Sequence, residues 1–335
     1  MRFAFTDDQL AFRDTVRDLL AKECPPAAVR AAWNATDRAP GGASIPGWSA
    51  LEEMGVLGAL APEDEGGLGL TEVDLVLLLE ESGAAALPGP IVEHAMVGAP
   101  IVGGPLRPAA VLSAPFSHDD VVPYADVATD LLLFAGGAWH LVARASVELQ
   151  PLPSVDHIRR LADVSWTAAP ATVVAEGAAA ERAFDRGALG TAAQLVGLAR
   201  RMILMTVEYV AERRQFGVPV GSFQAVKHHL ADARIALEFA RPLVHRAAWS
   251  LATDDAEASI HVSMAKAHAS DAAALAARKA LQCHGAIGYS DEHDLHLFMK
   301  RTWALAAAWG DAPWHRERVA RAILDVRTPP PDLRT

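Results

Sequence analysis

Two segments of the sequence carry residue types that recognise nucleotides. The first, residues 212–217, holds two arginines, a glutamine and a glycine, and Gln224 follows it; the second, residues 282–289, holds a glutamine and two glycines. Each segment combines a helix end with a loop whose arginine, glutamine amide and glycine N–H groups donate hydrogen bonds. Such donors suit a pyrophosphate and an adenine. Each segment also has a structural explanation, as an arginine at a helix C-terminus and as a glycine C-cap.

Other site chemistries find little support in the sequence. No G-x-G-x-x-G follows a strand, no P-loop is present, and the paired Glu-x-x-His motifs of a di-iron bundle are absent. The nearest approach to a metal cluster is His293 with His296, which would share a helix face and which we interpret as a polar helix start. Cys24 and Cys283 are too few for a disulfide framework or a zinc site, so both are expected to be small buried hydrophobic residues. No metal is predicted.

Composition limits the partners and the compartment. The chain has 335 residues, 51% of them hydrophobic, and a net charge of −11 without a run of lysine and arginine. Nucleic-acid binding is therefore not expected. No uninterrupted apolar run of about 18 residues is present, so no membrane span is predicted, and residues 1–5 show no secretory signal. These features and the few cysteines indicate a cytoplasmic protein.

The elements that must position the two segments form a mainly α protein with three predicted domains. Residues 1–108 are expected to be a helical domain, residues 109–180 a small, reduced middle β-domain, and residues 181–328 an antiparallel four-helix bundle. Thr6 and Gln9 have the spacing of a capping box, which predicts the start of the first helix. Thr71 is expected to cap a later, buried helix.

Short apolar runs bounded by turn residues predict the strands of the middle domain, at residues 111–112, 131–134, 140–142 and 171–174. Longer helical stretches follow at residues 189–214, 224–252 and 257–284, with shorter ones at 291–304 and 313–325. Long helices with short links favour an antiparallel bundle.

Taken together, the two donor segments resemble the C-terminal domain of the acyl-CoA dehydrogenases. The pattern consists of Arg213-x-x-Phe216-Gly217 with Gln224, and then Gln282-x-x-Gly285-x-x-Gly288-Tyr289. N-terminal phrases at residues 6–9, 54–58, 62–63 and 66–69 are similar to the family as well, so the resemblance covers nearly the whole chain. It implies an acyl-CoA dehydrogenase-like fold, FAD as cofactor, an acyl-CoA thioester as substrate of α,β-dehydrogenation, and assembly as a dimer or a dimer of dimers.

The resemblance also implies roles for individual residues. It assigns contacts with FAD across a subunit interface to Arg213, Phe216, Gln224, Gln282, Gly285 and Ala286. The family usually has glycine at the last of these positions, and an alanine there could crowd the approach of the backbone to the cofactor. Asp185 matches a family aspartate that lies near bound substrate.

The family's catalytic base is missing from both of its usual positions. The family uses a glutamate near the flavin to remove the α-proton of the thioester. Here Trp309 stands at one glutamate position and Gly187 at the other, and neither can act as a base. Asp311 lies two positions beyond the first; it is a candidate base, or the N-cap of a helix that begins at Pro313.

The middle domain departs from the family pattern too, which leaves three interpretations open. The Thr-Glu-Pro-Gly phrase that holds the flavin ring is absent, and residues 121–125 stand where a Trp-Ile-Thr-Asn-Gly phrase is expected. The chain is similar to the short subunit of heterotetrameric acyl-CoA dehydrogenases, which completes the FAD site of a catalytic partner. The alternatives are an autonomous homomeric dehydrogenase that uses a non-standard base, and a scaffold bundle that binds no flavin.

Overall fold

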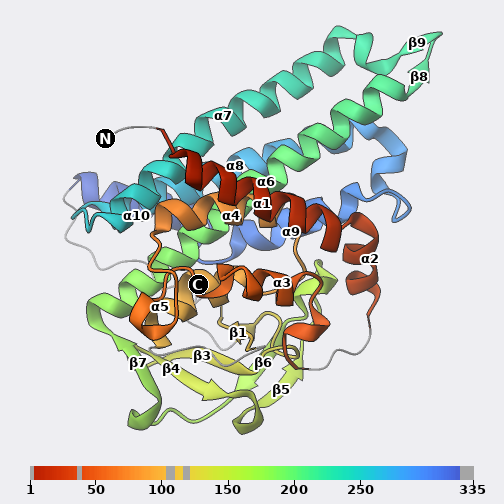
Figure 1. Ribbon diagram of the computed structural model, residues 1–335. Helices are drawn as coiled ribbons and strands as arrows, with labels where there is room; N and C mark the ends of the chain where they lie inside the picture. Colours follow the sequence, from red (N-terminus) through yellow and green to blue (C-terminus); the bar gives the residue numbers. More distant parts are fainter. Residues whose placement is uncertain (1–3, 36–39, 103–109, 116–120, 325–335) are drawn as a thin grey trace.

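A computed structural model describes residues 4–35, 40–102, 110–115 and 121–324 of the chain. Helices make up most of the molecule, and the small β region lies along one side of them (Figure 1). The mainly α fold class predicted from the sequence is confirmed.

The N-terminal helices start where the capping signals placed them. They are α1 (Asp7–Glu23), α2 (Pro26–Asn34), α3 (Trp48–Glu53), α4 (Glu72–Ala84), a π-helical segment (Val92–Gly98) and α5 (Ala99–Val102). The backbone N–H of Gln9 donates to Thr6 Oγ1 at 3.2 Å, and the backbone N–H of Thr6 donates to Gln9 Oε1 at 2.9 Å. Thr71 and Asp74 form the same reciprocal box at the start of α4. Both boxes satisfy N–H groups that would otherwise lack partners at a helix start.

Within the described residues, the middle region contains two small sheets. One has the strand order β1-β3-β4-β7 and the other β2-β6-β5, in which only β1 and β3 run parallel. The strands are β1 (Leu112–Ser113), β2 (Val121–Val122), β3 (Asp130–Ala135), β4 (Ala138–Ala143), β5 (Glu148–Pro151), β6 (Ala162–Ser165) and β7 (Val173–Glu176). The sequence did not predict β2, β5 and β6, because they are short and lack a clear apolar alternation. A separate core cluster, which includes Val122, Leu131 and Val164, packs within this region.

The C-terminal helices are α6 (Gly177–Glu212), α7 (Gln224–Ala252), α8 (Ala258–His284), α9 (Leu295–Ala307) and α10 (Ala312–Leu324). The bounds of α7 match the prediction. Helix α6 spans Gly177–Glu212, so it begins twelve residues before the predicted start at residue 189, because residues 178–183 are good helix formers and no break separates them from the rest of the helix. The expectation that His293 and His296 share a helix face is wrong, since α9 starts only at Leu295 and His293 lies in the preceding turn.

Helix α8 packs against α6 and α7, and α4 crosses α6 closely. The crossing depends on two glycines. A β-carbon added at Gly83 would lie 2.7 Å from Gln194 Cα, and one added at Gly197 would lie 2.8 Å from the Ala84 nitrogen. Any larger residue would force the helices apart, so these glycines fix the N-terminal helices against the bundle.

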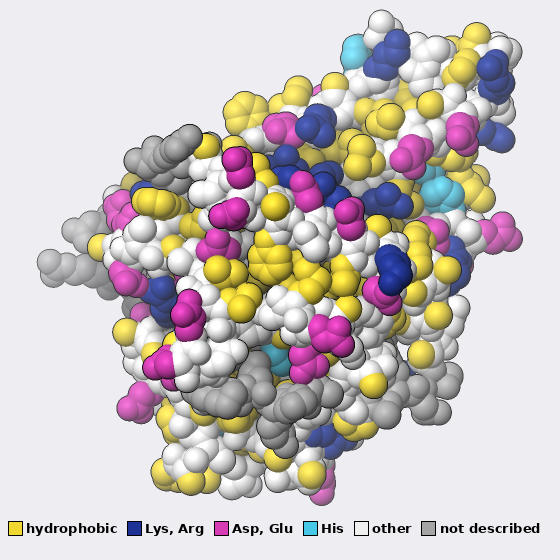
Figure 2. All heavy atoms as spheres, in the orientation of Figure 1, with side chains coloured by type: hydrophobic (Ala, Val, Ile, Leu, Met, Phe, Trp, Pro, Cys, Tyr) yellow, Lys and Arg dark blue, Asp and Glu magenta, His cyan; other side chains and the backbone are white. Residues whose placement is uncertain are grey.

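The far ends of α6 and α7 project beyond the rest of the molecule (Figure 1). A hairpin of β8 (Arg214–Gln215) and β9 (Val218–Pro219) joins them at the tip. Lysine and arginine side chains gather near this tip in the space-filling view (Figure 2). The first donor segment therefore lies on a projecting end of the molecule, with Arg213 and Arg214 exposed there.

Candidate functional site

The projecting hairpin presents the first donor segment. Helix α6 ends at Glu212, and the Arg213 N–H closes its last turn by donating to the Tyr209 carbonyl at 2.9 Å. Phe216 and Gly217 form the two-residue turn with φ of 53° and 82°. Two left-handed residues in succession fit a hairpin turn of type I′, which suits the twist of the flanking strands. Phe216 adopts this conformation although it is not glycine, and its side chain is 92% exposed.

Both donor segments meet in one pocket of about 720 Å³ between the ends of α6 and α8 and the start of α7. Four of the six residues assigned to the cofactor line it: Arg213, Gln282, Gly285 and Ala286. The two segments are far apart in the sequence, so their meeting is a property of the fold. The sequence prediction placed these residues at one site, and the structure brings them together.

Phe216 and Gln224, the other two assigned residues, do not line this pocket. Phe216 stands at the tip of the hairpin, and its ring lies edge-on to that of Phe223 with centroids 6.3 Å apart. Gln224 is the exposed first residue of α7, immediately before Ala225, which does line the pocket. Both side chains face solvent in the isolated chain, where a second subunit could reach them.

The pocket has the donors that an anionic cofactor requires. Arg213 is exposed and has no ion pair within the part of the chain that the structure describes. The start of α7 adds the N–H groups of a 29-residue helix, whose dipole favours a phosphate. Gly285 has a φ of 65°, and a β-carbon there would meet open space. The pocket therefore fits the pyrophosphate and adenine part of a dinucleotide.

Alanine at position 286 is accommodated without backbone strain. Ala286 is exposed on the pocket wall and is not among the residues with positive φ. The glycine that the family has at this position is therefore not needed for the chain to turn here.

Tyr209 and His284 form an aromatic wall that the sequence analysis missed. Their rings stack with centroids 4.4 Å apart, and both residues line the pocket. His293 contacts His284 edge-on at 4.6 Å. Burial lowers the pKa of His284, so its ring is neutral at pH 7. Tyr209 precedes Arg213 by one helical turn, and that spacing was the signal that could have identified it.

The two positions that hold the catalytic glutamate in the family lie against one another in this chain. The Trp309 side chain packs over Gly187, where an added β-carbon would lie 2.6 Å from Trp309 Cε2. Trp309 is 1% exposed, and the rings of Phe184 and Trp139 surround it with centroids 5.8 Å and 6.1 Å away. The volume around both base positions is therefore filled by aromatic side chains.

Buried polar groups hold the loop that carries Trp309. Lys266 Nζ donates to the carbonyls of Gly310 at 2.9 Å and Ala306 at 3.1 Å. Burial lowers the pKa of Lys266 to about 7, which the nearby Asp311 charge partly opposes. His315 Nε2 lies 2.9 Å from the Trp309 carbonyl, a contact that requires the proton on that nitrogen. Trp309 itself has a φ of 55°, and these contacts stabilise it in that conformation.

Asp311 acts as a helix cap. Its Oδ1 accepts a hydrogen bond from the Trp314 N–H at 2.8 Å, at the start of α10, and its side chain is exposed. This contact supports the structural alternative that the sequence offered for Asp311. The Asp311 side chain is exposed, whereas Trp309 is buried.

Asp185 is fully engaged by protein groups. Its carboxylate pairs with Arg318 at 2.6 Å and accepts a hydrogen bond from the Ser259 hydroxyl, and the residue is 2% exposed. The pairing connects α6 to α10 and α8. Asp185 therefore stabilises the packing of α6 against α8 and α10. Its place near the substrate stays a prediction.

A further carboxyl, that of Glu93, is buried beside Trp309. Burial raises the pKa of Glu93, and the Arg159 charge and the Trp309 indole only partly oppose this shift. The residue lies in the π-helical segment, a conformation that is often found at functional sites. Glu93 was not predicted as a site residue from the sequence, although a lone acidic residue within the apolar run 91–97 was a signal.

The described residues show neither a metal-binding cluster nor a membrane-spanning helix. No group of three or more histidine, cysteine, aspartate or glutamate side chains in that part of the chain could hold a metal ion. None of its helices combines the length and the apolar character that crossing a membrane would require.

Comparisons with known proteins agree with the motif resemblance. Residues 6–104 match the acyl-CoA dehydrogenase N-terminal domain, and residues 176–324 match the acyl-CoA dehydrogenase C-terminal domain. Acyl-CoA dehydrogenase IpdE2 of Mycobacterium tuberculosis is 32% identical over 88% of this chain and 91% of its own length. Acyl-CoA dehydrogenase FadE34 of the same organism is also 32% identical, but the chain spans only 49% of that protein.

Solved structures share the fold. One chain of the ChsE4–ChsE5 complex of Mycobacterium tuberculosis superimposes with a TM-score of 0.85 at 24% identity, covering 98% of this chain and 100% of that one. Butyryl-CoA dehydrogenase of Megasphaera elsdenii gives a TM-score of 0.80 at 19% identity, covering 97% and 100%. With both domain matches and a relative that is similar over most of its length, this chain belongs to the acyl-CoA dehydrogenase family of FAD-dependent oxidoreductases.

Proposed function

We propose that this chain is the non-catalytic subunit of a hetero-oligomeric acyl-CoA dehydrogenase and that it completes the FAD site of a catalytic partner. The observation that carries the proposal is the packing of Trp309 over Gly187. A glutamate at either position would need free space beside it for the thioester whose α-proton it removes. The aromatic side chains around Trp309 leave no such space next to Gly187.

The pocket that Arg213, Gln282, Gly285 and Ala286 line is called the hairpin pocket, and it supports the cofactor-binding part of the proposal. Arg213, Gln282 and Gly285 offer an arginine, an amide and a glycine turn at an exposed surface. In the assembled enzyme the bound FAD supplies the acceptor for the hydride from the acyl-CoA substrate. The role of this chain is to hold the anionic end of that cofactor. Arg213 makes a charge-assisted contact with it, and α7 donates hydrogen bonds from its N-terminal N–H groups.

Exposed apolar side chains near the pocket support a partner subunit. Phe216 is 92% exposed and Tyr289 is 77% exposed, and each belongs to one of the two donor segments. Large aromatic side chains with so little protein contact are typical of surfaces that bind another chain. The structural neighbours include chains from the ChsE4–ChsE5 complex and from the Tcur3481–Tcur3483 steroid enzyme, whose names describe assemblies of two components.

The alternative is an autonomous homomeric dehydrogenase that uses a non-standard base. Glu93 is the carboxyl that favours it, since Glu93 lies beside Trp309. Its raised pKa and its burial, with the residue only 5% exposed, argue against this role, because a base must be ionised and must reach the substrate. Asp311 is a weaker candidate, because its carboxylate caps α10.

The proposal is tested by purifying the chain alone and together with a longer homologue encoded beside it. We expect the lone chain to carry little FAD and to lack dehydrogenase activity towards acyl-CoA thioesters. The co-purified complex is expected to carry FAD and to be active. Stoichiometric FAD and full turnover in the lone chain would contradict the proposal and favour the autonomous enzyme.

A further inference from the structure

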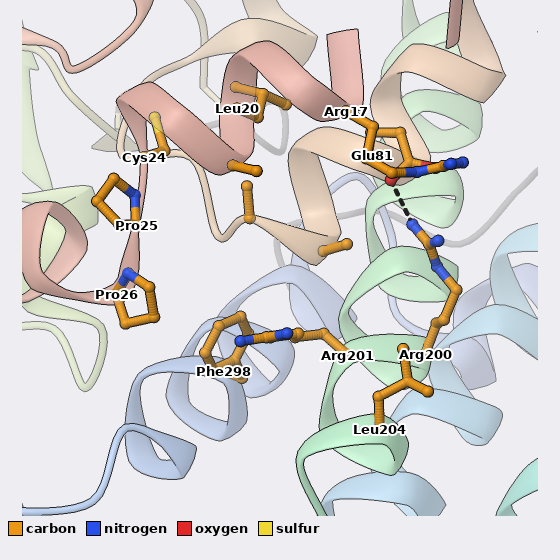
Figure 3. Close-up of a pocket in the computed structure, with 13 residues that line it drawn as sticks. Arg17, Leu20, Cys24, Pro25, Pro26, Glu81, Arg200, Arg201, Leu204 and Phe298 are labelled. Carbon is orange, nitrogen blue, oxygen red and sulfur yellow. Dashed lines mark hydrogen bonds and ion pairs between the residues drawn. The ribbon is translucent and has the colours of Figure 1, made fainter. Parts of the chain in front are cut away.

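A second pocket, of about 300 Å³, lies on α6 away from the cofactor surface. It is enclosed by α1, the start of α2, the end of α4, α6 and α9 (Figure 3). Arg201 in this pocket and Tyr209 in the hairpin pocket are separated by about 12 Å along the axis of α6. The two pockets share no lining residue, so this one is a separate feature.

The inner wall of this pocket is apolar. Leu20, Cys24 and Phe298 line it and are 1%, 3% and 2% exposed. Pro25 and Pro26 form the side opposite the arginines (Figure 3). Burial raises the pKa of the Cys24 thiol to about 12, so this residue is a neutral, apolar part of the wall. The apolar part of a ligand would therefore be removed from water in this pocket, which favours binding.

The opposite wall is cationic. Glu81 is 4% exposed, and its two carboxylate oxygens are occupied by Arg17 at 3.0 Å and by Arg200 at 2.6 Å. Arg17 also pairs with Asp14 at 2.9 Å. The Nε groups of both arginines are buried and have no hydrogen-bond partner in the structure. This wall therefore has donor groups that its own carboxylates do not satisfy.

Arg201 stands apart from this network. Its guanidinium lies 5.9 Å from the centre of the Phe298 ring, and in the described ranges it has no carboxylate partner. Figure 3 shows it between the Phe298 side of the pocket and the Glu81 network. The aromatic contact restricts where the guanidinium can lie, so the side chain loses less conformational entropy when an anion binds.

The charges at the pocket do not cancel. Among the described residues, the charged groups of this network are the guanidinium groups of Arg13, Arg17, Arg200 and Arg201 and the carboxylates of Asp14, Asp18 and Glu81. Four positive charges thus face three negative charges, which leaves one positive charge. A local positive charge is notable in a chain whose net charge is −11. One singly charged anion would neutralise it, whereas a doubly charged phosphate would leave negative charge in a largely apolar space.

We propose that this pocket binds a small monocarboxylate with an apolar body. The carboxylate pairs with Arg201, whose planar guanidinium matches a carboxylate with two parallel hydrogen bonds. The body lies against Leu20, Cys24 and Phe298. The volume is at the lower end of the range for small-molecule sites, so the ligand is a short chain or a single ring.

The test is calorimetric titration of the full-length chain with 4-phenylbutyrate, its neutral amide and inorganic phosphate. We expect one site for the carboxylate and none for the amide or for phosphate. Arg201→Gln removes the charge and keeps the length, and it is expected to weaken binding about tenfold or more. Arg316→Gln, at an exposed arginine on α10, is the matched control and should bind like the parent.

A second variant fills the pocket from its exposed rim. Ala21 lines the pocket mouth and is exposed, so Ala21→Trp should block binding without disturbing the core. Ala27→Trp, on the exposed face of α2 outside the pocket, should have no effect. Failure of 4-phenylbutyrate to bind, equal binding of the amide or of phosphate, or affinity unchanged in both pocket variants would overturn the proposal. Loss of binding in a co-purified complex, with the pocket covered by the partner, would instead identify it as a protein interface and also overturn it.

Discussion

The Trp309 indole lies over Gly187, so that a β-carbon added to the glycine would come within 2.6 Å of the indole Cε2 atom. In active members of the family, by the resemblance described above, one of these two positions carries the glutamate that removes a proton. Here both positions belong to one aromatic cluster with Phe184 and Trp139.

Truncating the buried indole should destabilise the fold strongly. Trp309→Ala leaves a cavity in a region where the side chain is 1% exposed. We expect the free energy of unfolding in urea to fall by about 3–5 kcal/mol. Trp303→Ala, at a tryptophan on α9 that is 47% exposed, is the control and should cost roughly 1 kcal/mol or less. Similar costs for the two variants would mean that Trp309 is not packed as described.

Adding a methyl group at Gly187 should clash with the indole. Gly187→Ala is expected to lower the free energy of unfolding by about 1–3 kcal/mol. In a Trp309→Phe background the smaller ring leaves room, so the cost of the same change should shrink. A double-mutant cycle measures this coupling. Strictly additive effects would contradict the direct contact between the two positions.

Removing the charge of Arg213 should weaken the hold on FAD in the co-purified complex. Arg213→Gln is expected to reduce affinity by roughly tenfold or more, since a charge-assisted contact to the pyrophosphate is lost. Flavin absorbance after gel filtration measures retention. Arg214→Gln is the control, because Arg214 is the exposed neighbour of Arg213 and does not line the pocket. Equal retention in the two variants would show that the pocket does not hold the cofactor.

Removing the carboxylate of Asp311 should affect stability and leave turnover unchanged. Asp311→Ala deletes the hydrogen bond from the Trp314 N–H to Oδ1 and is expected to cost about 1 kcal/mol. Turnover of the complex per bound FAD should stay at the parent level. A loss of turnover greater than about tenfold, without loss of FAD, would restore Asp311 as a candidate base.

The pH dependence of stability should reflect the buried His315. Burial lowers the pKa of His315 to about 3 from an ordinary value of 6.5. Above pH 6.5 the ring is neutral in both the folded and the unfolded chain. As pH falls from 6.5 towards 3 only the unfolded chain gains the proton, so the free energy of unfolding decreases.

This group should contribute a loss of roughly 2 kcal/mol between pH 6.5 and 5. Urea unfolding of the parent and of His315→Gln at the two pH values isolates its share, and the variant should show a correspondingly smaller decrease. An identical pH dependence for both proteins would contradict a neutral, buried His315.

Local signals in the sequence were reliable guides to much of the fold. The capping box of Thr6 and Gln9, three positions apart, formed as predicted. Thr71 caps α4 as predicted, and the structure adds Asp74 as its partner in a second box. Helix α7 begins and ends where a glycine–proline break and an aspartate pair bound it. The arginine and glycine segments of the cofactor surface could be paired because the family pattern contains both.

Other features depend on contacts between residues far apart in the chain. The packing of Trp309 over Gly187 requires the relative placement of α6 and the loop after α9, which no local pattern specifies. The buried Glu93 lies in an apolar run whose periodicity does not reveal a π-helix. Short strands such as β2, with two residues, form because a partner strand is available, so intrinsic preference says little about them.

A structure of the complex between this chain and its catalytic partner tests the central claim most directly. We expect FAD whose ring lies in the partner and whose pyrophosphate end contacts the pocket of Arg213 and Gly285, with Trp309 still packed over Gly187. A flavin seated beside Trp309 within this chain, or an Arg213 pocket that faces solvent far from any cofactor, would contradict the account.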